Sequence, residues 1–303
     1  MNKIKQLALF LIFLMAAAGW LCPSQAAAWG RGHFYAIGIG PAGPRTATLQ
    51  ALDTIKRMDF IVAPKDSQVR LFADYIKDKP ILFDPWTGIW DYKGKMQEKL
   101  NKEELSKFKI ERFRIRDRRV ERIKRLLAQG KDVGLLDSGN PSLFGPSHWY
   151  IEQFDPRDVV IIPGMGCDAA AMAALGKSTI PAHDTRFVMQ TAPFFLMGRD
   201  MGDKQILRDL SKYPTTMILY MALKNPKRLF EALGEVLPAD MPCAVVYWAG
   251  YPDRQHILLG TVADMGEKLS REKERFMGLL LIGRFLEGKP YESAMKQVRK
   301  QLE

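Results

Sequence analysis

Residues 33–57 read HFYAIGIGPAGPRTATLQALDTIKR and contain the local signals of a strand, a turn and a helix. Residues 33–38 are a short apolar run that ends in glycine, which is typical of a buried strand. Residues 46–57 carry apolar side chains at helical spacing. The glycine and proline residues between them predict a tight turn. A strand, a glycine turn and a helix in this order are the repeating unit of a parallel α/β sheet.

The same alternation continues through the first half of the chain. Residues 93–125 carry fourteen Lys or Arg against six Asp or Glu, and one apolar stripe at helical spacing follows Val120, Ile123, Leu126 and Leu127. We interpret this stretch as a solvent-exposed helical region with one buried face. The other predicted strands are residues 60–63, 81–82, 133–136 and 159–162, and the other predicted helices are residues 67–77 and 168–175.

After about Thr185 the apolar runs become longer. Strands are predicted at residues 216–222, 244–247, 257–261 and 279–282, and helices at residues 226–237 and 262–271. The strand at 257–261 lies close after residues 251–255, which predicts a hairpin. The fold class is therefore α/β with two α/β domains, the first with a mainly parallel sheet and the second with a mixed sheet.

The amino-terminal residues have the layout of a secretory signal peptide. Lys3 and Lys5 precede an apolar run at residues 7–21, and a small-residue AAA sequence ends at Ala28. A spanning helix needs roughly 20 apolar residues, so this run is short. We expect cleavage after Ala28, export to the periplasm and no stable membrane span afterwards. An uncleaved anchor that leaves the protein facing the periplasm is the alternative.

These boundaries give four expected segments. They are a signal peptide at residues 1–28, an N-terminal α/β domain at 29–158, a C-terminal α/β domain at 159–290 and a tail at 291–303. Loss of Lys3 and Lys5 with the signal lowers the formal charge from +11 to +9.

The composition is that of a globular protein, with 47% hydrophobic and 26% charged residues. Cys167 and Cys243 are expected to be free buried thiols. The four histidines are scattered and no CxxC motif occurs, so no metal site is expected. No nucleic-acid recognition motif accompanies the basic charge, so nucleic acid is not an expected partner.

Three glycine turns follow predicted strands, at the sheet edge where open α/β folds bind their ligands. They are GIGPAG at residues 38–43, SGNPSLFG at 138–145 and PGMGC at 163–167. The first turn lacks the third glycine of the dinucleotide fingerprint, and Pro41 removes an N–H donor. A nicotinamide enzyme is therefore disfavoured.

In their order and spacing, these motifs resemble the tetrapyrrole methylases over residues 34–287. The family's GxGPGD loop and TLxAL helix match GIGPAGPRTATLQAL at 38–52, SGDPxxFG matches SGNPSLFG, and PGxSSxxAAxAxLG matches PGMGCDAAAMAALG at 163–176. The second half adds YMAL at 220–223, PCAVVYWAGYPDRQHILLGTV at 242–262 and LLLIGRFL at 279–286. Ala249 and Gly250 followed by GTV are most similar to the precorrin methyltransferases.

The resemblance implies an S-adenosylmethionine-dependent methyltransferase that acts on a tetrapyrrole or corrinoid-like substrate, and a homodimer. It implies a cofactor cleft between the two domains, lined by main chain and small side chains. Pro41 would lie at the substrate-facing rim of the first loop. The second loop would hold homocysteine and ribose through Gly139, Asn140, Pro141 and Leu143. Gly166 and Cys167 would replace a small polar pair, and the adenine would be surrounded by Met221, Gly250 and Gly278.

The chain departs from the family pattern at two positions. Gly43 replaces the acidic residue after GPG, and Asn140 replaces the aspartate of GDP. The first change is compatible with an altered substrate side, and either is compatible with weakened catalysis, with binding without methylation, or with neutral drift. A proton acceptor is needed at the end of the reaction, and Asp137, Asp168, Tyr220 and Tyr247 are candidates among which the sequence does not choose.

Two other functions are kept open. One is an exported protein that binds a tetrapyrrole without methylating it, and the other is a methylase of a different substrate such as a peptide. The aromatic residues Phe83, Trp86, Trp90 and Tyr92 are either a lid over a flat macrocycle or a packed loop.

Overall fold

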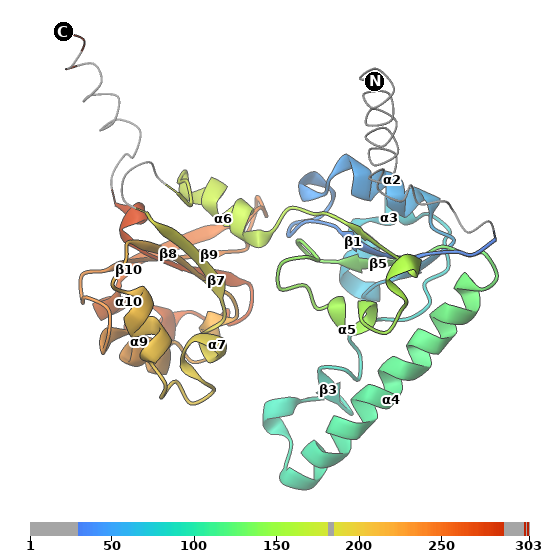
Figure 1. Cartoon of the computed structure of the whole chain (residues 1–303), viewed down its shortest axis with the longest axis horizontal. Helices are drawn as coiled ribbons and strands as arrows, with labels where there is room; N and C mark the ends of the chain where they lie inside the picture. The colour runs from blue at the N-terminus through green and yellow to red at the C-terminus, as the bar shows by residue number, and fades with distance from the viewer. Residues whose placement is uncertain (1–29, 181–184, 288–299, 301, 303) are drawn as a thin grey trace, which may run out of the picture.

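A computed structural model describes residues 30–180, 185–287, 300 and 302 of the chain. They form two α/β units joined by one extended crossing (Figure 1). The expected signal peptide at residues 1–28 lies outside the described residues. Of the expected tail at 291–303, only residues 300 and 302 are described.

The first unit is built on a four-stranded parallel sheet. Its strand order is β2-β5-β1-β6, and β1 pairs with both β5 and β6. These strands are short and apolar because helices cover both faces, as the sequence predicts. The bounds are β1 Phe34–Gly38, β2 Phe60–Val62, β5 Val133–Asp137 and β6 Val159–Ile162.

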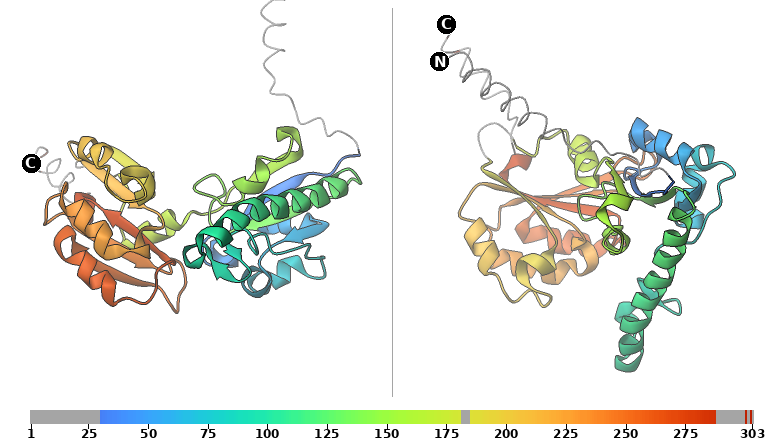
Figure 2. Two further views of the ribbon diagram at one scale, coloured as in Figure 1. Left: turned by 90° about the horizontal axis from the view of Figure 1, so that it is seen from below. Right: turned by 45° about the vertical axis from the view of Figure 1, so that its right-hand side comes forward.

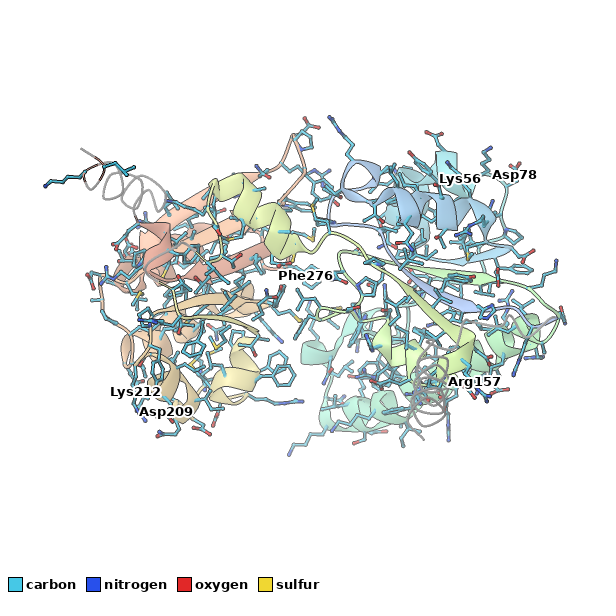
Figure 3. All side chains as sticks on the ribbon, turned by 45° about the horizontal axis from the view of Figure 1, so that its top comes forward. Lys56, Asp78, Arg157, Asp209, Lys212 and Phe276 are labelled. Atoms are coloured by element: carbon cyan, nitrogen blue, oxygen red, sulfur yellow. The ribbon has the colours of Figure 1, made fainter. Side chains whose placement is uncertain are left out.

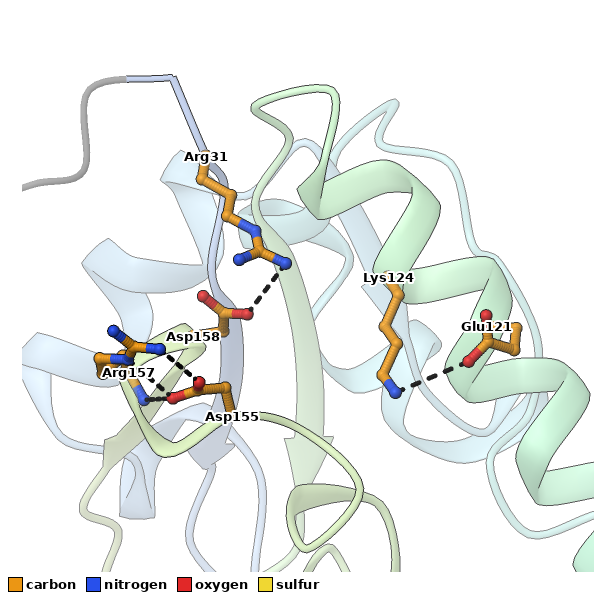
Figure 4. Close-up of polar contacts among 6 residues, drawn as sticks. All are labelled: Arg31, Glu121, Lys124, Asp155, Arg157 and Asp158. Carbon is orange, nitrogen blue, oxygen red and sulfur yellow. Dashed lines mark hydrogen bonds and ion pairs between the residues drawn. The ribbon is translucent and has the colours of Figure 1, made fainter.

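The strand β6 corrects the expected division between residues 158 and 159. Its main chain pairs with β1 from Phe34↔Val159 to Ile37↔Ile162, so it belongs to the first sheet. The chain leaves the first unit only after Ile162 and reaches the second with helix α6 (Cys167–Leu175). Figure 4 shows that the ion pair between Arg31 and Asp158, 3.4 Å, lies beside this strand.

Three predictions on the first unit change in detail. The helix expected at 67–77 is divided into a π-helical turn, η2 (Lys65–Val69), and a short helix, α3 (Ala73–Ile76). The expected strand at 81–82 is a single bridge between Ile61 and Ile81. The helix expected at 46–57 begins later, as α2 (Leu49–Arg57), because Thr48 caps it and accepts a hydrogen bond from the Ala51 N–H at 3.0 Å.

The basic stretch forms one long helix, α4 (Lys102–Leu127), which extends away from the sheet (Figure 2). Asn101 and Glu104 form a capping box at its start. Its second half packs Val120, Ile123 and Leu127 against the first sheet, as predicted, and most charged side chains face solvent. A small hairpin precedes it, with β3 (Asp91–Tyr92) and β4 (Lys95–Met96).

The second unit contains a mixed sheet, as predicted, with the order β10-β9-β11-β8-β7. All neighbours are antiparallel except β7 and β8, and the predicted hairpin is β9–β10. Helix α6 packs on one face through Ala170, Ala171 and Met172, and α9 and α10 pack on the other. The strands are β7 Phe187–Thr191, β8 Thr215–Leu219, β9 Pro242–Tyr247, β10 His256–Thr261 and β11 Gly278–Ile282.

The remaining helices connect these strands. The sequence predicts α9 and α10 but not α5, α7, α8 or the edge strand β7. The bounds are α5 His148–Ile151, α7 Pro193–Met197, α8 Gln205–Leu210, α9 Pro226–Gly234 and α10 Val262–Arg271. The 3-10 turns are η1 Pro44–Thr46, η3 Gln97–Lys99, η4 Pro156–Asp158, η5 Ala222–Lys224 and η6 Arg284–Leu286.

Candidate active site

The three glycine turns meet at the carboxyl ends of β1, β5 and β6. Gly139 donates its N–H to the Gly40 carbonyl at 3.0 Å, and the Gly40 N–H returns to the Gly139 carbonyl at 3.4 Å. A Cβ on Gly164 would lie 2.1 Å from the Gly139 oxygen and 2.6 Å from the Gly38 carbonyl carbon. The three main chains therefore pack so closely that these contacts require glycine.

Gly139 differs from the neighbouring glycines because the space that a Cβ would occupy on it is open. It has a φ of +87°, and a Cβ there would find only the Met165 oxygen, at 3.9 Å. A ligand can therefore approach the main chain at this point without a Cβ in the way. This arrangement fits a small-molecule cofactor held by main-chain groups.

The other residues predicted on the first two loops keep those loops in shape. Asn140 Oδ1 accepts a hydrogen bond from the Ser142 N–H at 3.0 Å, so asparagine keeps a turn contact available to aspartate. Pro141 is buried, and a Cβ on Gly38 would lie 2.6 Å from its Cδ. Pro41 is half-buried in the first loop, between Gly40 and Gly43, which both have positive φ.

Two polar contacts that sequence reasoning missed hold the loops together. The Gln68 side chain, 9% exposed, donates from Nε2 to Ser138 Oγ at 2.6 Å. The hydroxyl of Thr48 donates to the Pro163 carbonyl at 3.3 Å. Thr48 was within reach as the cap of a predicted helix, whereas the sequence carries no signal for Gln68.

The third loop opens α6 and places Asp168 beside Gly166 and Cys167. A Cβ on Gly166 would lie 2.1 Å from Asp168 Oδ1, so the carboxylate of Asp168 lies against Gly166. Burial, and then the Asp168 charge, raise the pKa of the Cys167 thiol to about 11. Burial, with Asp168 and Cys167, also holds the pKa of Tyr220 far above its ordinary range. Asp168 therefore acts electrostatically on both neighbours.

The residues predicted in the second unit lie at three strand ends. Gly250, with a φ of +86°, contacts the first loop, since a Cβ on it would lie 3.0 Å from Ala42 Cβ. Met221 follows β8, adopts a φ of 53° and is 56% exposed. Gly278 opens β11, where a Cβ would lie 2.4 Å from Leu223 and 2.9 Å from the Tyr247 ring. The structure thus brings Gly250 to the glycine loops, while Gly278 is required for packing inside the second unit.

An aromatic contact joins the second loop to the second unit. Phe144, with a φ of 58°, stacks on Tyr220 at 5.5 Å and meets the edge of Phe195 at 6.3 Å. The predicted Leu143 packs with the cluster around α6. Phe144 is 43% exposed and lies inside the SGNPSLFG motif, yet sequence reasoning passed it over. Phe276, 72% exposed, lies on the side of the second unit that faces the first (Figure 3).

The four candidate proton acceptors differ in exposure. Asp137 is 1% exposed, accepts from the Ser147 N–H at 3.3 Å, and has a pKa raised by burial. Tyr247 is buried, and Tyr220 donates to Gln190 Oε1 at 3.0 Å. Only Asp168 combines partial exposure with a place directly after a glycine loop, in the first turn of α6. It is the best placed of the four.

Other features of the described residues lie away from these loops. Over residues 30–180 and 185–287, no three His, Cys, Asp or Glu side chains form a cluster able to hold a metal. Cys167 and Cys243 are free thiols, of which Cys243 is buried as expected and Cys167 is only partly buried. In the same ranges no helix has the length and apolar character to cross a bilayer. A hollow of about 500 Å³ lies between the β3 turn and α4, and one of about 550 Å³ lies between α9 and α10.

The fold and site define a two-unit α/β protein that presents main-chain loops to a small ligand. The chain belongs to the tetrapyrrole (corrin/porphyrin) methylases, whose family profile matches residues 33–266.

Among curated proteins, the chain is 27% identical over 259 residues to a cobalt-precorrin-4 C(11)-methyltransferase of Methanocaldococcus jannaschii, covering 84% of this chain and 88% of that protein. It is 25% identical over 258 residues to a uroporphyrinogen-III C-methyltransferase of the same organism, covering 83% and 96%.

Solved structures of the family share the fold. A cobalt precorrin-4 methyltransferase matches with a TM-score of 0.65 and 22% identity over 88% of this chain and all of that one. A uroporphyrin-III C-methyltransferase of Thermus thermophilus, complexed with S-adenosylhomocysteine, matches with a TM-score of 0.55 and 16% identity over 84% and 99%. These likenesses confirm the predicted α/β fold.

Proposed function

We propose that this protein transfers a methyl group from S-adenosylmethionine to a carbon atom of a carboxylated tetrapyrrole. The observation that carries the proposal is the meeting of three glycine loops around the open main chain of Gly139. Family membership supports the reaction class, and relatives named for cobalt-precorrin-4 and uroporphyrinogen-III support the substrate class.

The cofactor would lie against Gly139, Asn140, Pro141 and Leu143, with Gly166 and Cys167 on one side and Met221 and Gly250 on the second unit. Gly278 would support this wall indirectly, because the absence of a Cβ there leaves room for the Leu223 side chain. When bound, the cofactor supplies a methyl group already activated by a positively charged sulfur. The chain needs only to align the reactants and exclude water, which is a large part of many rate accelerations.

Calorimetric titration of residues 29–303 with S-adenosylmethionine and S-adenosylhomocysteine tests the cofactor site. Gly139→Trp should abolish binding by filling the open space at Gly139. The matched control is Gly176→Trp, because Gly176 also has a positive φ and an open Cβ direction but ends α6 away from the loops. If Gly139→Trp binds as well as the wild type, the site is misplaced.

A protein that binds a tetrapyrrole without methylating it is the second candidate. Gly43 and Asn140 favour it, because both family carboxylates are missing. A Cβ on Gly43 would meet only Leu71, at 3.8 Å, so there is room for an acidic side chain. Mass spectrometry of uroporphyrinogen III after incubation with cofactor separates the candidates. A methylated product supports the enzyme, whereas binding without a mass shift supports the carrier, and a shift on a peptide would instead indicate a peptide methylase.

We also propose that residues 1–28 export the protein to the periplasm and that it forms a homodimer. The basic, apolar and small-residue order of the leader supports export. Amino-terminal sequencing of protein from the periplasmic fraction should begin at Trp29.

Light scattering on the purified protein should give twice the mass of one chain, and a monomer mass would refute the dimer.

A further inference from the structure

Helices α4 and α5 carry an arginine and tryptophan cluster that the proposed reaction does not use. The guanidinium carbons of Arg112 and Arg116 lie 4.6 and 4.9 Å from the centre of the Trp149 ring. Arg112 also lies 5.3 Å from the Trp90 ring. Phe113, 45% exposed, packs against Trp149 at 5.0 Å. Two cations therefore share one aromatic surface.

The cluster contains more arginines than carboxylates that pair with them. Arg116 pairs with Asp117 at 2.8 Å. Among the described residues, no carboxylate lies within ion-pair distance of Arg112, and neither its buried Nε nor the buried Nε1 of Trp149 has a hydrogen-bond acceptor. Burial and the Arg116 charge lower the pKa of Arg112. A half-buried cation beside another cation is costly unless an anion joins it.

The surrounding groups do not supply that anion. Arg119, the next arginine on this face of α4, donates to the carbonyl oxygens of Pro85 and Thr87 and to the Tyr150 hydroxyl, which are neutral. The rings on Arg112 favour a cation and hold its plane in place, but they give its N–H groups no acceptor. The Nη groups of Arg112, which are not buried, are thus left for an external acceptor.

The cluster is also close to the proposed site along the chain. Trp149 lies on α5, which begins at His148, three residues after the second glycine loop ends at Gly145. The substrate class proposed above carries several carboxylates, and arginine binds carboxylates through paired N–H donors.

We propose that Arg112 and Arg116, packed over Trp149, bind a carboxylate side chain of the tetrapyrrole substrate. This inference rests on the proposed function, and it assigns a substrate-binding role to the first half of α4. The same site favours macrocycles with more carboxylates, since each added acidic arm gives another group that can reach the two arginines.

The test uses two stable porphyrins as probes, the octacarboxylate uroporphyrin III and the tetracarboxylate coproporphyrin III. Fluorescence titration measures the affinity of the mature chain for each, and calorimetry measures S-adenosylhomocysteine binding. Arg112→Met removes the charge but keeps a long apolar side chain over Trp149. We expect uroporphyrin affinity to fall about tenfold or more, as for a lost charged hydrogen bond, with cofactor affinity unchanged.

The matched control is Arg114→Met on the same helix, where the arginine is exposed and lies 3.9 Å from Glu111. It should leave both affinities unchanged. If Arg112→Met does not fold, Arg112→Lys is used, which keeps the charge but loses the planar donor pair and should weaken uroporphyrin more than coproporphyrin.

The outcomes separate the two proposals. If the wild type binds S-adenosylhomocysteine, and the wild type and Arg112→Met bind uroporphyrin equally well, the carboxylate site alone is overturned. Wild-type protein that binds no cofactor overturns the methyltransferase. In that case, a uroporphyrin affinity lost only in the Arg112 variant still supports the carboxylate site.

Discussion

Asp168 is the residue of the candidate site whose charge acts on two neighbouring side chains, Cys167 and Tyr220. Its charge raises the pKa of Cys167 in addition to burial, so the thiol titrates near pH 11 instead of 9. Because the folded-state pKa is raised, the neutral thiol stabilises the fold below about pH 9, and this contribution is lost as the pH rises through 11.

We therefore expect Asp168→Asn to lower the Cys167 pKa and to speed its alkylation by iodoacetamide at pH 9. The physical reason is that the thiolate no longer faces a carboxylate. The pH profile of the alkylation rate, followed by mass spectrometry, checks this. Cys243 serves as an internal control, since Asp264 rather than Asp168 acts on it. An unshifted profile would show that burial alone sets the pKa.

Phe144 has an uncommon backbone conformation, because a bulky residue rarely adopts a positive φ. Its stack on Tyr220 offsets that strain. A double-mutant cycle of Phe144→Leu and Tyr220→Leu should give a coupling energy of about 1 kcal/mol. Urea unfolding of the four proteins measures it. Additive effects of the two changes would mean that the rings only overlap without stabilising each other.

At the scale of elements, the capping box of α4 stabilises the free end of a long helix. Asn101 Oδ1 accepts from the Glu104 N–H at 2.8 Å, and Glu104 accepts from the Asn101 N–H at 3.1 Å. Asn101→Ala should weaken the first turn by about 1 kcal/mol. Hydrogen exchange in residues 102–106 should accelerate, while exchange near Val120 should not. Acceleration along the whole helix would indicate that the cap controls all of α4.

Elements with a strong local pattern were predictable from the sequence, and those set by distant contacts were not. The strand 159–162 and the helix 262–271 have the predicted bounds. The helix expected at 67–77 is divided at Phe72, and in its π-helical first part the Gln68 side chain bonds Ser138, seventy positions away, a contact that no local pattern encodes. The edge strand β7 was not predicted, because its side chains alternate only between exposed and half-buried positions.

The candidate site was predictable to the extent that it consists of glycine turns at strand ends. Their meeting follows from the parallel sheet order, because strands β5, β1 and β6 are neighbours. The contribution of Phe195 was not predictable, since α7 comes from a part of the chain without a recognised motif. The packing role of Gly278 was also hidden, because sequence alone does not distinguish a glycine that admits a ligand from one that admits a leucine.

For the molecule as a whole, Gly250 is a point where the second unit contacts the first loop. Gly250→Val should separate the two, because a Cβ there would lie 3.0 Å from Ala42 and 3.3 Å from Thr46. We expect a larger radius of gyration by small-angle scattering and weaker S-adenosylhomocysteine binding. Gly176→Val is the control, since it has a similar φ and an open Cβ direction. Unchanged scattering and affinity would show that the contact is not needed for the relative position of the units.

The crossing between the units, residues 163–166, belongs to the third glycine loop and is the only place where the described chain passes from one sheet to the other. A cofactor held by that loop, as proposed, would restrict the joint, so part of its binding free energy would offset any freedom that the two units lose. By reciprocity, anything that locks the units together raises cofactor affinity. Two separately produced halves, cut at this joint, should therefore reassemble more readily with cofactor than without it.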